Sequence, residues 1–266
     1  MGTRLTRYVL VVVGAASAVG LVVAMLVPPR VLLVGDSITG QYAPAAAAEL
    51  RDRGYDPVVR AYPGVGLLDR SPRIDAPALI RADLAKTRPS SVVAEFSGDY
   101  GIADPPLPGV PLGSRSFFID WKAQADALTH EVRGRGASLL WLLVPRPVRG
   151  STGTDVGLAA LYEQERRPGV GVVDPAPVFA RYEVNGDLHA PDGRHVSAAG
   201  SALVARLVAE RVGTQPPWRL RLRTLSRSPL AVAAAVAALL GLVVAISHRP
   251  RSRNMAPRRS SVPITP

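Results

Sequence analysis

Short apolar runs alternate with longer amphipathic segments through most of this chain. The runs are rich in Val, Leu and Ala and are bounded by Gly, Pro, Asp or Ser, which is typical of strands buried on both faces. We expect five strands, at residues 31–34, 57–61, 91–96, 138–144 and 170–173. Between and after them, apolar residues recur at helical spacing and predict helices at residues 43–53, 75–87, 117–133, 155–166 and 197–212.

This strand and helix order predicts a single α/β domain. Five strands that are each followed by a helix form a parallel sheet covered on both faces, a three-layer α/β/α sandwich of the flavodoxin-like kind. We assign residues 31–215 to this domain. Its length suits one hydrophobic core and is short for two.

Two further apolar runs lie outside the domain, at residues 9–27 and 230–246. Each is about long enough to cross a bilayer as a helix. The prediction is therefore a cytoplasmic stub and transmembrane helix within residues 1–30, a basic juxtamembrane linker at 216–229, a second transmembrane helix at 230–246 and a basic disordered tail at 247–266. The alternative for the first run is a cleaved signal peptide with a small-residue site at residues 16–18, but cleavage there would leave an apolar new N-terminus.

The charge distribution separates a membrane protein from a nucleic-acid binder. The formal net charge is +11, yet residues 31–218 carry 20 basic and 21 acidic residues, so the excess lies at the two ends beside the apolar runs. That placement favours two spans, cytoplasmic tails and a domain outside the cell membrane, and no nucleic-acid partner. With no cysteine, the chain has neither a disulfide nor a thiolate metal site.

Candidate catalytic residues follow the ends of the predicted strands. Ser37 comes directly after the first strand, in a Gly-Asp-Ser turn, and the distant sequence Asp192-Gly193-Arg194-His195 precedes the last helix. A serine hydroxyl becomes a nucleophile when an imidazole takes its proton, and a carboxylate can orient that imidazole. The alternative is that these are turn residues, with Asp36 or Ser37 capping a helix.

Together these two sequences resemble the SGNH (GDSL-type) hydrolase family. Gly35-Asp36-Ser37 is similar to the family's nucleophile block, and residues 192–200 are similar to its Asp-x-x-His block. The resemblance implies an α/β/α fold and ester cleavage or acyl transfer through an acyl-serine, with Ser37, His195 and Asp192 as the catalytic residues and without metal or other cofactor. It also implies an oxyanion hole built from Ser37 and either Gly64 or Gly66.

The third block departs from the family. Asp99 stands where an asparagine would donate a hydrogen bond to the oxyanion. Loss of one such donor typically costs about 2.7–4 kcal/mol. A protonated Asp99 could still donate, but that needs its pKa raised by about three units.

Other residues near the same edge are candidate substrate contacts, namely Asp36, Tyr100 and Arg146, although for Arg146 the pattern favours a solvated side chain over an anion contact. The proline-rich residues 102–116 form either a lid or an inert connection. The leading hypothesis is a membrane-anchored esterase acting on acyl or acetyl esters of cell-envelope glycans or lipids. The alternatives are an acyltransferase that uses the same acyl-serine and a binding module that has lost catalysis.

Overall fold

The core of the described chain is a five-stranded parallel sheet. In this computed structural model the described residues are 27–70, 74–96, 110–144, 153–182 and 187–214, with 233 and 236. The strands are β1 (Arg30–Gly35), β2 (Asp56–Ala61), β3 (Ser91–Glu95), β4 (Ser138–Leu142) and β5 (Val170–Val173), in the spatial order β2-β1-β3-β4-β5. The predicted parallel sheet is confirmed. The chain first adds β2 on one side of β1 and then returns to add β3 on the other side, so successive strands are placed in opposite directions from β1.

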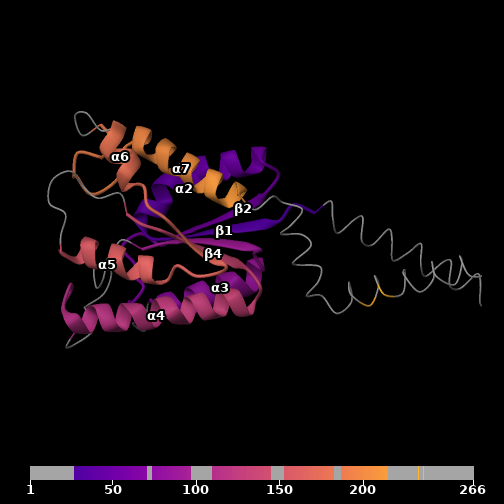
Figure 1. Cartoon of the computed structure of the whole chain (residues 1–266), viewed down its shortest axis with the longest axis horizontal. Coiled ribbons are helices and arrows are strands. Elements are labelled where there is room, and N and C mark those ends of the chain that lie inside the picture. Colours follow the sequence, from indigo (N-terminus) through magenta and orange to yellow (C-terminus); the bar gives the residue numbers. More distant parts are fainter. Residues whose placement is uncertain are drawn as a thin grey trace, which may run out of the picture. The chain divides into compact units, whose positions relative to one another are not determined.

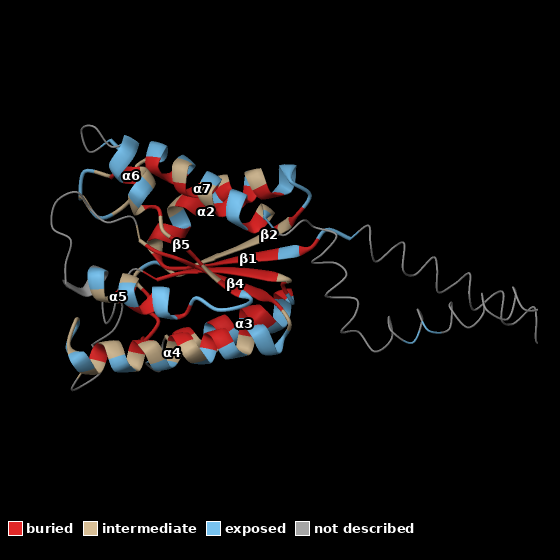
Figure 2. Cartoon of the chain, viewed as in Figure 1, coloured by how far each residue is buried: buried red, intermediate tan, exposed pale blue. Residues whose placement is uncertain are grey.

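Two helical layers cover the sheet (Figure 1). One holds α2 (Ser37–Asp52), α6 (Ala176–Tyr182) and α7 (Ala198–Gly213), and the other holds α3 (Ala76–Thr87), α4 (Arg115–Gly134) and α5 (Gly153–Gln164). Alternate residues of a strand serve the two layers. On β1, Val31 and Leu33 pack with α2 and α7, whereas Leu32 and Val34 pack with α3 and α4. The central strands are therefore buried on both sides, as Figure 2 shows.

The helix after β1 begins earlier than the sequence predicts. The expected start near residue 43 is wrong, because α2 begins at Ser37 and carries Pro44 in its interior. The Asp36 side chain caps the helix by accepting a hydrogen bond from Ile38 N at 2.9 Å. This cap makes an early start favourable, and Pro44 removes only one hydrogen bond from the helix. As a result Ser37 is the first helical residue.

The predicted membrane spans lie outside the described residues, apart from Val27, Ala233 and Val236. None of the helices within the described ranges combines the length and the apolar character needed to cross a bilayer.

Candidate active site

The structure brings the three predicted catalytic side chains together at the carboxyl edge of the sheet. Ser37 Oγ lies 3.0 Å from His195 Nε2, and His195 Nδ1 lies 2.5 Å from Asp192 Oδ2. With the shared proton on Nδ1, the free Nε2 accepts from the serine hydroxyl. This is the order of contacts by which a carboxylate orients an imidazole that deprotonates a serine.

Ser37 lies at the point of the sheet where successive strands are added on opposite sides of β1. It follows β1, beside which β2 and β3 lie on opposite sides, and in open parallel sheets the crevice forms at this point. The N–H of Tyr62, after β2, donates to Gly35 O at 2.8 Å and ties the loop after β2 to the serine turn. The two loops therefore share one edge of the crevice.

The loop that carries His195 is a short closed turn held against α2. Ala190 N donates to His195 O at 2.8 Å, and His189 and Val196 form an antiparallel bridge. Gln41 was not predicted from the sequence, and its Oε1 accepts from Val196 N at 3.0 Å. Gln41 lies one helical turn after Ser37 on the same face of α2, so its i+4 spacing was the available signal.

Asp192 serves both the loop and the imidazole. Its Oδ1 accepts from the backbone N–H groups of Arg194 and His195, each at 2.9 Å, which leaves Oδ2 for the ring. The hydrogen bond from the His195 ring, followed by those from the two backbone groups, holds the pKa of the Asp192 carboxyl well below its usual range. Asp192 is therefore ionised wherever a histidine can act as a base.

The geometry distinguishes the two glycines that the sequence left open. The Gly66 N–H donates to the buried Asp69 carboxylate at 2.8 Å, so it is already occupied. Gly64 has a φ of 74° and sits in a turn closed by Val65 N donating to Tyr62 O at 3.0 Å. Only glycine adopts that conformation readily, and no described residue accepts from the Gly64 N–H. Of the two N–H groups, therefore, only that of Gly64 has no acceptor among the described residues.

The remaining predicted residues divide into one correction and three that lie outside the described residues. Asp36 is fully buried and caps α2, a position that does not fit the predicted contact with substrate. Asp99, Tyr100 and Arg146 fall outside the described residues. Within the described ranges, no group of three His, Asp or Glu side chains could hold a metal ion.

The comparisons agree with this architecture. A family model described as a protein of unknown function (DUF459) matches residues 30–211. No curated protein matches the sequence at a significant level.

Several solved structures share the fold at low identity. A lipase/acylhydrolase from Enterococcus faecalis is 18% identical over 69% of this chain and 95% of its own, with a TM-score of 0.53. A catalytic mutant of an acetylxylan esterase from Geobacillus stearothermophilus is 15% identical over 70% and 94%, also with a TM-score of 0.53. A protein assigned to the lipolytic G-D-S-L family from Desulfitobacterium hafniense DCB-2 is 17% identical over 68% and 98%, with a TM-score of 0.52. These likenesses show that the chain has the SGNH hydrolase fold.

Proposed function

We propose that this chain, which belongs to the DUF459 family, is a membrane-anchored serine esterase that cleaves acyl or acetyl esters of cell-envelope glycans or lipids. The observation that carries the proposal is the continuous series of contacts from Ser37 through His195 to Asp192. A histidine that is only solvated has water at its ring nitrogens, whereas His195 has a serine hydroxyl 3.0 Å from one ring nitrogen and a carboxylate 2.5 Å from the other.

The proposed reaction has two halves. His195 Nε2 takes the Ser37 proton while Oγ attacks the ester carbonyl, and the N–H groups of Ser37 and Gly64 stabilise the oxyanion. The alcohol leaves with the proton from Nε2, and an acyl-Ser37 remains. Water then attacks the acyl group, gives its proton to Nε2, and releases the acid together with free Ser37.

Solvent access supports hydrolysis over acyl transfer. The side chain of His195 is 31% exposed and that of Asp192 is 51% exposed, so in the described part of the chain water reaches the base directly. An acyltransferase must keep water from the acyl-enzyme long enough for another alcohol to react.

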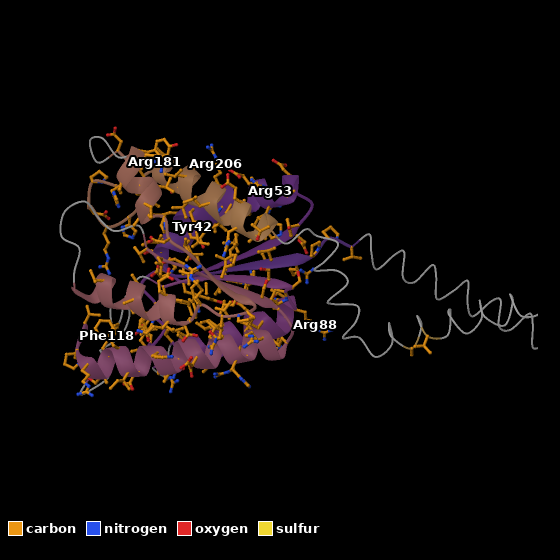
Figure 3. All side chains as sticks on the ribbon, in the orientation of Figure 1. Tyr42, Arg53, Arg88, Phe118, Arg181 and Arg206 are labelled. Carbon is orange, nitrogen blue, oxygen red and sulfur yellow. The ribbon has the colours of Figure 1, made fainter. Side chains whose placement is uncertain are left out.

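The described chain enters and leaves the domain at the amino edge of the sheet, away from Ser37. It enters β1 next to Pro29, whose carbonyl accepts from Asp56 N, and it leaves α7 next to Arg53, whose Nη1 donates to Ala209 O at 3.2 Å. Arg53 follows the end of α2, at the amino edge of the sheet, in Figure 3. Ser37 lies at the other end of this helix, whose 16 residues span about 24 Å.

With a first span ending at Val27, only two prolines separate the proposed membrane helix from β1. Reporter fusions at residues near 30 and 229 test this topology, and a cytoplasmic location for residue 120 would overturn the envelope substrate.

The test of the esterase is hydrolysis of short-chain nitrophenyl esters by the full chain in detergent, compared with Ser37→Ala and Asp99→Asn over a range of pH. Ser90→Ala, at the opposite edge of the sheet, is the matched serine control. Turnover that disappears in Ser37→Ala and persists in Ser90→Ala is the expected result. If neither the wild type nor Asp99→Asn cleaves any ester, the esterase proposal fails.

A further inference from the structure

Besides Asp192, a second acidic residue, Glu95, lies against the turn that carries Ser37. It is the last residue of β3 and has no exposed surface. Its backbone oxygen accepts from Asp36 N at 3.3 Å, and its Oε2 accepts from both Thr39 N at 3.1 Å and Thr39 Oγ1 at 2.9 Å. Glu95 therefore joins the end of β3 to the first turn of α2 through three hydrogen bonds.

Asp36 is buried beside it. Neither side chain has exposed surface, and no donor of the described residues reaches Glu95 Oε1. Burial and then the neighbouring Asp36 carboxylate raise the pKa of Glu95 well above its usual range. Among the described residues, the other titratable groups that interact with Glu95 are Tyr42 of α2, which is labelled in Figure 3, and Tyr162 of α5. Neither phenol supplies the positive charge that would favour two ionised carboxylates.

This pair determines which N–H groups remain available at the start of α2. A helix begins with backbone N–H groups that have no partner within the helix. The Asp36 side chain takes the N–H of Ile38, and Glu95 takes the N–H of Thr39. The N–H of Ser37 has no acceptor among the described residues, so it is left for an oxyanion.

The packing around the pair leaves little freedom. A Cβ atom on Gly35 would lie 1.9 Å from Glu95 O and 2.2 Å from Thr39 Oγ1. The backbone immediately before the serine turn thus lies directly against Glu95 and Thr39. A change in length or charge at Glu95 would be transmitted directly to Ser37.

We propose that Glu95 is a positioning residue that carries the single proton of a buried Glu95–Asp36 pair and thereby holds the Ser37 turn in its reactive geometry. Glu95 donates that proton to the Asp36 carboxylate and accepts from Thr39. The predicted effect of Glu95 on catalysis rests on the proposed esterase function. The proton on Glu95 and its hydrogen bonds do not, because both can be measured without any substrate.

The first experiment measures the proton. Infrared difference spectra of the full chain and Glu95→Gln at pH 7 should show a protonated carboxylic acid band that the variant lacks. Gln preserves the pattern of hydrogen bonds, because its amide donates to Asp36 and its oxygen accepts from Thr39. Absence of the band in the wild type would overturn the shared proton, whether or not the protein cleaves an ester.

The second experiment measures positioning. Glu95→Gln should keep kcat/KM within about threefold and leave the pH profile unchanged, whereas Glu95→Ala should lower kcat by about 10²-fold with KM little changed. Amide exchange at Thr39 should accelerate in Glu95→Ala and stay slow in Glu95→Gln. If Glu95→Ala does not fold, Thr39→Val, which removes only the hydroxyl donor, should lower kcat with the same unchanged KM.

The outcomes separate this proposal from the esterase proposal. Equal losses of kcat in the Gln and Ala variants would show that the negative charge of Glu95 is needed, which contradicts a neutral Glu95. Normal kcat in Glu95→Ala and in Thr39→Val would show that the pair does not position Ser37. If no ester is cleaved by the wild type, the infrared band and the exchange rate at Thr39 still decide the proposal.

Discussion

Replacing Gly200 with Ala tests how rigidly the fold holds the proposed base. Gly200 lies in the first turn of α7, where its N–H donates to Ser197 Oγ at 3.1 Å. A Cβ atom there would lie 2.1 Å from the backbone oxygen of Leu188 and 3.3 Å from Val196 Cβ. Both residues flank the loop that carries His195, so the extra methyl group must push that loop away from α7.

The size of the effect follows from the shortest contact. Atoms that would meet at 2.1 Å must separate by about 1 Å, and such overpacking typically costs about 1–3 kcal/mol. The higher helix propensity of Ala returns up to about 1 kcal/mol. We expect a net destabilisation of about 1–2 kcal/mol, or a fall in Tm of roughly 2–8 °C. A displacement of His195 by about 1 Å should lower kcat by about 10²-fold.

Thermal unfolding and ester hydrolysis check both numbers. The matched control is Gly134→Ala at the end of α4, where a Cβ atom would meet nothing within 4 Å. This control should keep full activity and a Tm at or slightly above that of the wild type. A Gly200→Ala variant that behaves like the control would refute the argument, because it would show that the Leu188 carbonyl does not hold the loop in place.

Four further predictions concern the site and the loop after β2. Asp192→Asn should lower kcat with little change in KM, because the amide cannot stabilise the imidazolium that forms at His195, and steady-state kinetics measure this split. In the wild type, the lowered pKa of Asp192 means that its ionised form, and the support it gives, persists as the pH falls below the usual carboxyl range near 4, so the acid limb of the pH profile should fit a single protonation. Asp69→Ala should destabilise the protein by about 1–3 kcal/mol in urea unfolding, because it leaves the buried Gly66 N–H without an acceptor, and a smaller loss would place water at that N–H. Dialysis against EDTA should leave hydrolysis unchanged, and recovery of lost activity by added zinc would reveal a metal requirement.

The strands were predictable from the sequence because their chemistry is local. Each is a short apolar run buried on both faces, and in an α/β domain such a run is typical of a central strand of a parallel sheet. The start of α2 was not predictable in the same way, because Pro44 discourages a helix locally while the favourable contacts come from elsewhere. One of them, from Glu95 to Thr39, crosses from a strand 56 residues away. Helix α6 was missed because its seven residues are too few to show a helical period.

The meeting of Ser37, His195 and Asp192 at one edge of the sheet was predictable because two short sequence blocks carry them. The choice between Gly64 and Gly66 was not, since it depends on where one side chain points. Asp69 turns back on the loop and occupies the Gly66 N–H, and nothing in the pattern of that loop distinguishes this from a solvated aspartate. The role of Asp36 as a buried cap likewise became visible only with the neighbouring strand in place.

The other predicted oxyanion donors determine how large an effect the aspartate at position 99 should have on the rate. Ser37 and Gly64 each have a backbone N–H without an acceptor among the described residues, whereas the N–H groups of Ile38 and Thr39 donate to Asp36 and Glu95. The loss of one oxyanion donor costs about 10²–10³ in rate, while the full enhancement by an enzyme is many orders larger. For the proposed esterase, we therefore expect an aspartate at position 99 to lower the rate without abolishing it. The increase in kcat of Asp99→Asn at neutral pH, compared with its effect at acidic pH where the carboxyl gains a proton, measures how much of that rate the negative charge withholds.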